Sequence, residues 1–322
     1  MKKLNECKIL VTPTSYGSQD TTLKTDLEIL VDKVVYNTTG KPLRSDQLQM
    51  ILADMDGMIA GLDEIDKKAL ESAPNLKVVA RYGVGYNNVD LKAAKLNKIT
   101  VTNTPGANAK SVAELTIALI LNLLRPVLPA AKGVQDGEWP RFKGISLEGK
   151  TVGLIGLGAI GKETARRLSG FDCQILAYDI IKNEEFAEQN NVVYKPLDFL
   201  LSQSDIVSLH LPGTPDTAGT VDEEFIGKMK TGSWIVNTAR GELIDEAALI
   251  RALNSGKLRG AAVDVYQQEP PDKKNPLLKM ENVIATPHMG AHSDSATNTM
   301  GRIALEECLL VLQGKEPNYR IV

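Results

Sequence analysis

The sequence predicts an α/β protein made of two doubly wound domains, each built on a parallel sheet. Short β-branched runs alternate with helical patterns from Lys8 onward, and a second series of the same kind follows the linker 136–150. Such alternation is typical of parallel strands joined by helices that cover the sheet. The length of 322 residues and the hydrophobic content of 43% also favour two domains with a core each.

Twelve runs are predicted to be strands. Those of the first series are KILVT, VVYN, DGMIAG, LKVVAR and ITVTN, separated by helical patterns such as SDQLQMILAD and DEIDKKALESA. Those of the second series are TVGLIG, QILAYD, NVVY, DIVSLHLP, SWIVNT, RGAAVDV and NVIATP. A final helical pattern, from about Ser293, places one apolar face on Met300, Ile303, Ala304, Cys308 and Val311.

Composition argues against several classes of partner. The formal charge is -3 and there is no polybasic block, so neither nucleic acid nor an anionic membrane is an expected partner. The apolar stretch after Pro105 contains Glu114 and Asn122 and falls short of the ~20 apolar residues of a spanning helix, so it is predicted to be a buried helix. No signal peptide is evident at the N-terminus. The three cysteines are far apart, which predicts reduced thiols and a cytoplasmic protein.

The stretch TVGLIGLGAIGKETARRL has the pattern of a strand, a glycine-rich turn and a helix that begins near Ile160. Its glycines, Gly156, Gly158 and Gly161, would form the tight turn, admit a pyrophosphate close to the backbone and let helix and strand pack. The helix N-terminus would offer unpaired N–H groups to the phosphates. Asp179, at the end of the next strand, would bind ribose hydroxyls and repel a 2′-phosphate, so a Rossmann domain that binds NAD is predicted.

Three polar residues follow strands of the second series at their carboxyl ends, where open α/β sheets bind ligands. Arg240 follows SWIVNT, Glu269 lies in the loop YQQEPP, and His288 follows the last strand. Singly, each is more often a surface or structural residue. Together they leave the rim of the sheet that carries the phosphate loop, which favours a shared catalytic role.

Hydride transfer between an alcohol and NAD requires the groups that these residues offer. His288 would exchange the hydroxyl proton, because an ordinary imidazole pKa of about 6.5 suits both directions. Glu269 would favour the protonated ring and fix its tautomer. Arg240 would bind the substrate carboxylate and polarise the carbonyl.

The chain resembles the D-isomer-specific 2-hydroxyacid dehydrogenases from about residue 8 to its C-terminus. The motifs that carry the resemblance are GLGAIGK, HLPGTPDT, NTARGELIDEAAL, AAVDVYQQEPP and TPHMGAHS, in the family's order. The resemblance implies that Arg240, Glu269 and His288 are the catalytic residues. It also implies a discontinuous, flavodoxin-like substrate domain, 1–102 and 290–322, around a Rossmann domain, 103–289. A homodimer joined through the helix after Pro105 is expected.

Further site residues are implied by the same resemblance. The substrate, a small 2-hydroxy or 2-keto acid, would contact the N–H groups of Val84 and Gly85, and Asn108 nearby. The cofactor would contact the three glycines of the loop and Ala159, Ile160, Asp179, Leu211, Thr238, Asp264 and Gly290.

Two positions depart from the family pattern, and one of them concerns the substrate. The phosphoglycerate dehydrogenases, which the chain otherwise resembles, usually carry an arginine for the substrate phosphate where this chain has Gly61. D-3-phosphoglycerate is therefore in doubt as the substrate, unless Arg81 compensates. Asn87 stands where aspartate is common, which is expected to alter only local turn bonding.

The two histidines of TPHMGAHSD, His288 and His292, could be considered as metal ligands. Met289 and Gly290 intervene and Pro287 precedes, which does not fit a helical zinc motif, so no metal is expected. His292 is predicted to be a capping or surface residue. His210 is predicted to line the cofactor pocket.

Other functions remain open on the sequence alone. A hydroxypyruvate or glyoxylate reductase is the first alternative, in which Trp139 would reach a neighbouring subunit's pocket, although packing is the simpler role. An NAD(H)-sensing corepressor-like protein is the second, disfavoured because such proteins typically have tryptophan where this chain has Ala291. Formate dehydrogenases typically have glutamine in place of Glu269.

Overall fold

The computed structural model describes residues 2–322, which divide into two compact units. Unit 1 comprises the chain up to Asn108 together with Ala291–Val322, and unit 2 is Ala109–Gly290. The boundaries predicted from the sequence lay after residues 102 and 289, a few residues earlier at the first crossing and one residue earlier at the second.

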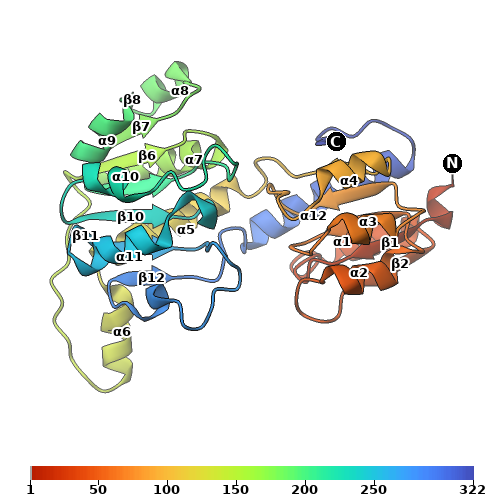
Figure 1. The fold of residues 1–322 in the computed structure, drawn as a ribbon, viewed down its shortest axis with the longest axis horizontal. Coiled ribbons are helices and arrows are strands. Elements are labelled where there is room, and N and C mark those ends of the chain that lie inside the picture. Colours follow the sequence, from red (N-terminus) through yellow and green to blue (C-terminus); the bar gives the residue numbers. More distant parts are fainter. Residues whose placement is uncertain (1) are drawn as a thin grey trace. The chain divides into compact units, whose positions relative to one another are not determined.

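Unit 1 contains a parallel five-stranded sheet of order β2-β1-β3-β4-β5 (Figure 1). This is the order of flavodoxin-like folds, as predicted. Its strands are β1 (Lys8–Val11), β2 (Lys33–Tyr36), β3 (Gly57–Ala60), β4 (Val78–Arg81) and β5 (Thr100–Thr102).

Helices cover both faces of this sheet because successive strand residues point to opposite sides. Leu10 packs in a core with helices α2, α3 and α4, whereas its neighbours Ile9 and Val11 pack with α1 and α12. The helices of unit 1 are the short 3-10 turn η1 (Leu4–Glu6), α1 (Thr22–Leu30), α2 (Ser45–Leu52), α3 (Lys67–Glu71), α4 (Leu91–Leu96) and α12 (Asp294–Leu312).

Unit 2 contains a parallel seven-stranded sheet of order β12-β11-β10-β9-β6-β7-β8. This is the doubly wound order of dinucleotide-binding folds, extended by one strand, so the predicted Rossmann architecture is confirmed. Its strands are β6 (Thr151–Ile155), β7 (Gln174–Tyr178), β8 (Val192–Tyr194), β9 (Ile206–Leu209), β10 (Ser233–Asn237), β11 (Leu258–Val263) and β12 (Val283–Ala285).

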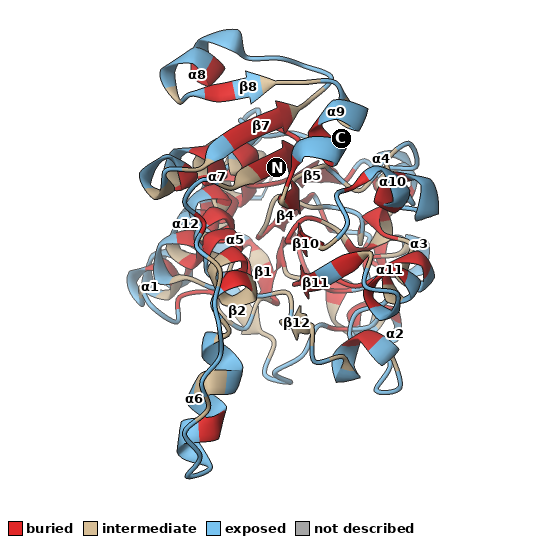
Figure 2. Ribbon diagram, turned by 90° about the vertical axis from the view of Figure 1, so that its left-hand side faces the viewer, coloured by how far each residue is buried: buried red, intermediate tan, exposed pale blue. Residues whose placement is uncertain are grey.

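Two cores flank the sheet of unit 2, and its strands are largely buried (Figure 2). One core lies under α9, α10 and α11, and the other under α5, α7 and α8. The helices are α5 (Ala109–Leu124), α6 (Val127–Gln135), α7 (Ala159–Leu168), α8 (Glu184–Gln189), α9 (Leu197–Gln203), α10 (Glu223–Lys228) and α11 (Glu246–Asn254), with 3-10 turns η2 (Ser169–Phe171), η3 (Gly241–Leu243) and η4 (Pro276–Lys279).

The apolar segment after Pro105 forms α5, which belongs wholly to unit 2 and buries one side against α7 and the sheet. No single helix in residues 2–322 is both long and apolar enough to cross a membrane. Helices α5 and α6 reach that length and apolarity only when taken together, and the chain bends by 69° between them.

Candidate active site

The three glycines of the loop between β6 and α7 differ in what a side chain would meet there. Gly156 has a φ of +95°, and a Cβ added there would lie 2.7 Å from the carbonyl oxygen of His210. A Cβ on Gly161 would lie 2.2 Å from the Gly156 oxygen, whereas one on Gly158 would meet nothing within 4 Å. The first and third glycines therefore permit the turn and the packing, and the second leaves open space at the helix N-terminus.

The residues around this open space fit a dinucleotide. Helix α7 begins at Ala159 with no side chain capping its first turn, so backbone N–H groups of that turn are available to phosphate oxygens. Asp179 follows β7 and accepts hydrogen bonds from Leu157 N at 2.6 Å and from Ile181 N at 3.0 Å, one on each carboxylate oxygen. Its carboxylate is thereby fixed beside the loop, with lone pairs left for ribose hydroxyls.

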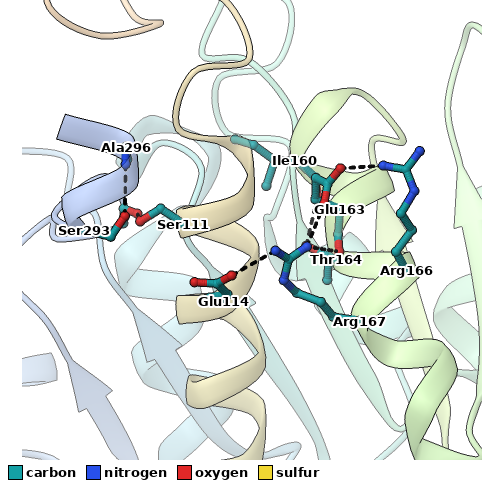
Figure 3. A network of polar contacts seen from close by, with 10 residues as sticks. Ser111, Glu114, Ile160, Glu163, Thr164, Arg166, Arg167, Ser293 and Ala296 are labelled. Carbon is teal, nitrogen blue, oxygen red and sulfur yellow. Dashed lines mark hydrogen bonds and ion pairs between the residues drawn. The ribbon is translucent and has the colours of Figure 1, made fainter. Parts of the chain in front are cut away.

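An ion-pair network fastens α7 to α5 (Figure 3). Arg167 of α7 contacts Glu114 of α5 at 2.9 Å and Glu163 of its own helix at 2.7 Å, and Arg166 also pairs with Glu163. Burial acts to raise the pKa of Glu163, but the two arginines outweigh it and hold that pKa below its usual range. The phosphate-facing helix is thus held to its neighbour by charges that persist at neutral pH.

Glu269 and His288 lie in direct contact, as the sequence analysis expected. His288 Nδ1 is 2.6 Å from Glu269 Oε2, and both side chains are about one-third exposed. Burial acts to raise the pKa of Glu269, but the hydrogen bond and charge of His288, the Tyr266 N–H and Arg240 hold it below its usual range. Glu269 is therefore ionised at neutral pH, and Nε2 is the imidazole nitrogen left for a substrate.

Asp264 organises the loop that carries His288. Its carboxylate, almost wholly buried, accepts hydrogen bonds from the Thr286 hydroxyl at 2.6 Å and from Met289 N and Gly290 N at 2.9 Å each. Its carbonyl oxygen accepts from His288 N at 2.8 Å, and His288 has a φ of +50°. These bonds hold His288 in a left-handed backbone conformation that a residue with a side chain rarely adopts.

Gly290 is fixed from both sides. Its N–H donates to Asp264, and its carbonyl oxygen accepts from the Ser111 hydroxyl on the first turn of α5 at 2.7 Å. Asp264 and Gly290 were both predicted to bind the cofactor. Their main-chain and side-chain contacts here also secure the His288 loop.

Arg240 lies in the turn after β10, which Asn237 holds in place. Asn237 is buried at the end of the strand, and its side-chain amide accepts from Ala239 N at 3.0 Å and donates to Arg240 O at 2.8 Å. The Arg240 guanidinium is half-buried and donates to Ala239 O at 2.6 Å. Its charge contributes to the lowered pKa of Glu269, so the guanidinium acts on the same group as His288.

The other predicted cofactor residues of unit 2 lie at the carboxyl ends of β9 and β10. Thr238 is buried with its hydroxyl 2.8 Å from that of Thr116 on α5, and Leu211 packs against the core. His210 begins the loop after β9, with Nε2 3.1 Å from the Ser208 hydroxyl. Burial lowers the pKa of His210 to about 4, so its ring is neutral at physiological pH.

The predicted substrate residues Val84, Gly85 and Asn108 all belong to unit 1. Val84 and Gly85 are half-exposed in the loop after β4. Asn108 Oδ1 is buried and has no hydrogen-bond partner among residues 2–322. Arg81, which was considered as a substitute for a phosphate-binding arginine, is buried, and its guanidinium donates to backbone carbonyls, including that of Gly61.

Several positioning residues were not identified from the sequence. Asn237, Thr286 and Ser111 make contacts with residues distant in the chain or across a turn, which residue type alone does not reveal. The one available signal was position, because Asn237 and Thr286 stand at strand ends next to Arg240 and His288.

The described part of the chain contains no group of three or more His, Cys, Asp and Glu side chains placed to hold a metal ion. His292 is exposed and precedes Ser293, whose side chain caps α12 by accepting from Ala296 N. The capping role considered for His292 therefore belongs to its neighbour.

Comparison with known proteins agrees with this geometry. Residues 117–290 match the family described as D-isomer specific 2-hydroxyacid dehydrogenase, NAD binding domain. The chain is 40% identical to a glyoxylate reductase from Thermofilum pendens over 89% of this chain and 87% of that enzyme. It is 43% identical to a D-3-phosphoglycerate dehydrogenase from Archaeoglobus fulgidus over 78% of this chain and 48% of that enzyme, and so spans about half the length of this relative.

A solved structure of similar fold is the apo form of D-lactate dehydrogenase from Escherichia coli, with a TM-score of 0.87 and 29% identity over 98% of this chain and all of that one. The fold, the phosphate loop and these matches define an NAD-dependent oxidoreductase that acts on CH–OH donors. The chain belongs to the D-isomer-specific 2-hydroxyacid dehydrogenase family, with NAD as its cofactor.

Proposed function

We propose that His288, Glu269 and Arg240 carry the reaction of this D-2-hydroxyacid dehydrogenase. The observation that supports this most is the 2.6 Å contact between His288 Nδ1 and an ionised Glu269. When bound, NADH would supply a hydride to C2 of a 2-keto acid. His288 Nε2 gives its proton to the carbonyl oxygen and the ring is left neutral, while Glu269 keeps the hydrogen bond to Nδ1 and Arg240 holds the substrate carboxylate.

Exchange of His288 tests this assignment, and His292 offers a matched control. His288→Ala is expected to lower kcat at least a hundredfold with NADH affinity kept, because the proton donor is lost. His292→Ala should leave kcat within twofold of the parent value. Equal losses in both folded variants would show that His288 has no special role.

We propose further that the substrate is a short unphosphorylated 2-keto acid such as glyoxylate or hydroxypyruvate. Gly61 offers no side chain, and the Arg81 guanidinium is engaged with the carbonyl oxygens of Ala60, Gly61 and Gly85. A phosphate needs a cationic partner in this kind of site. The relative named glyoxylate reductase, matched over most of both chains, supports the same substrate class.

The experiment is NADH oxidation with glyoxylate, hydroxypyruvate, pyruvate and phosphohydroxypyruvate. We expect kcat/KM for the two short acids to exceed that for phosphohydroxypyruvate at least tenfold. A Cβ on Gly61 would lie 3.4 Å or more from its neighbours, so the first atom of a side chain is tolerated there, and Gly61→Arg should raise kcat/KM for phosphohydroxypyruvate. A parent enzyme that prefers phosphohydroxypyruvate would instead be a D-3-phosphoglycerate dehydrogenase.

We also propose that the protein is a cytoplasmic homodimer. The cytoplasmic location is supported by three free cysteines, Cys7, Cys173 and Cys308, whose pKa values burial raises so that the thiols stay protonated. The dimer is supported by exposed apolar side chains on and after α6, a helix whose ribbon is mostly in the exposed colour in Figure 2. They are Val127, Leu128, Val134, Trp139 and Phe142.

A further inference from the structure

Three consecutive backbone carbonyls in the loop after β4 are all hydrogen-bonded within unit 1. The carbonyl oxygens of Gly83–Gly85, taken in order, accept from Thr104 N at 3.1 Å, from Asn103 Nδ2 at 2.8 Å and from Arg81 Nε at 3.1 Å. Asn103 and Thr104 follow the neighbouring strand β5, and Arg81 ends β4. The loop is therefore held from two strand ends.

This bonding fixes the direction of the N–H groups. In a planar trans peptide the C=O of one residue and the N–H of the next point in opposite directions. The carbonyls of Gly83–Gly85 point to their donors in the protein, so the N–H groups of Val84, Gly85 and Tyr86 point away from those donors. Within residues 2–322 none of these three N–H groups has an acceptor. Successive backbone N–H groups without a partner in the protein can form an anion-binding nest.

Arg81 connects the nest to a third strand end. Its side chain is buried, at 2% exposure, and besides Gly85 O it donates to Ala60 O at 2.6 Å and to Gly61 O, where β3 ends. The planar guanidinium can bridge carbonyls at fixed angles, which a lysine ammonium cannot reproduce. One side chain thus joins the end of β3 to the last peptide of the nest.

We propose that Arg81 is a positioning residue for the substrate carboxylate, and that Tyr86 N–H is the third donor of the nest. Arg81 orients the Gly85–Tyr86 peptide and touches neither the substrate nor a phosphate. The inference rests on the proposed function, since it assumes that the anion is the carboxylate of a 2-keto acid. Arg81 then contributes to substrate affinity, and it takes no part in cofactor binding or in proton transfer by His288.

The test compares Arg81→Ala, Arg81→Lys and a control, Arg302→Ala, which removes an exposed cation of unit 1 that pairs with Asp20. In both Arg81 variants KM for glyoxylate should rise at least tenfold while kcat changes less than threefold. The Kd of NADH, measured by fluorescence, and the pH profile of kcat should stay as in the parent. Millimolar guanidinium ion should partly restore KM in Arg81→Ala only.

Oxalate binding to the NADH-loaded protein, measured by calorimetry, separates this inference from the proposed function. A parent that binds oxalate but reduces no 2-keto acid would overturn the function, and loss of oxalate binding in Arg81→Ala would still support the nest. Unchanged oxalate affinity in folded Arg81→Ala, or a loss confined to phosphorylated acids, would overturn the inference. If Arg81→Ala does not fold, Asn103→Ala replaces it, with the same rise in KM expected and an unchanged KM counting against the nest.

Discussion

Glu269 acts on the proton of His288 through charge. The carboxylate stays ionised because the hydrogen bond from His288 and the charge of Arg240 outweigh the effect of burial on its pKa. The ionised carboxylate lies 2.6 Å from His288 Nδ1, so it orients the ring and leaves Nε2 for the substrate. The proton transfer that we propose for His288 therefore depends on a residue that does not touch the substrate.

Glu269→Gln tests this dependence. Glutamine keeps a hydrogen-bond acceptor but not the charge, so the ring of His288 is held less firmly. We expect kcat for glyoxylate to fall at least tenfold while the Kd of NADH stays as in the parent. Initial rates with NADH saturating would measure the change. An unchanged kcat would mean that the charge of Glu269 is not needed for the reaction.

The free energy of unfolding depends on pH through the protonation of His210. Burial lowers its pKa from 6.5 to about 4, so between these values the unfolded chain binds a proton that the folded chain does not. The stability that this group contributes is complete above pH 6.5 and is lost as pH falls toward 4. Over that range the loss amounts to at most about 3 kcal/mol.

His210→Asn should flatten this pH dependence, since asparagine does not titrate. Urea unfolding at pH 7 and pH 5 would give the free energy of unfolding, and the difference between the two should be smaller in the variant by about 1–2 kcal/mol. His292→Asn, at an exposed site, is the control and should keep the parent difference. A variant as acid-sensitive as the parent would assign the loss to other groups.

At the scale of elements, the twelve strands were predicted from the sequence but the helix limits were not. Strands of a parallel sheet are buried on both faces and form continuous apolar runs, which stand out in the sequence. The pattern 63–73 indicated a longer helix than α3, Lys67–Glu71. Asp63 is instead buried and accepts from Leu43 N at 2.8 Å, while Asp66 caps the helix through Ala69 N. Such tertiary bonds cannot be read from residue type.

In the candidate site too, local patterns were predicted from the sequence and tertiary hydrogen bonds were not. Arg240, Glu269 and His288 were found because they stand at strand ends, where topology alone brings side chains to one edge. The bonds that Asp264 makes to Thr286, Met289 and Gly290 depend on a chain reversal that no local pattern specifies. The sequence therefore indicated that Glu269 and His288 meet, and the structure was needed to show what holds them.

In the turn between β6 and α7, Gly161 serves packing and Gly158 serves ligand binding, so substitutions can test the two roles separately. Gly161→Ala would bring a Cβ against the Gly156 carbonyl and should lower the free energy of unfolding by about 1–3 kcal/mol. Gly158→Ala meets open space, so its stability should equal that of the parent while the Kd of NADH rises at least tenfold. Urea unfolding and NADH fluorescence titration would measure both effects. A stable Gly161→Ala, or unchanged binding in Gly158→Ala, would contradict these roles.

At the scale of the whole molecule, the apolar segment around α6 is the strongest candidate for subunit contact. Leu128 is 56% exposed and Trp139 is 76% exposed, and removing both from water on association would be favourable. Leu128→Asp with Trp139→Asp should convert a dimer into a monomer, as measured by light scattering after size exclusion. Ile29→Asp, at a side chain 75% exposed on α1, is the matched control. A parent that is already monomeric would refute the dimer.

The hydrogen bond between Ser111 and Gly290 has a consequence for how such a protein can be assembled. These residues lie near the two ends of unit 2, so the chain enters and leaves that unit at neighbouring points. Unit 2 is therefore inserted at a place that a short loop could also close. A domain whose two ends lie close together can be replaced by another without changing the fold of the domain that it is inserted into. One nucleotide-binding unit can thus be combined with many different substrate-binding units. Chimeric enzymes would be joined at residues 108 and 290.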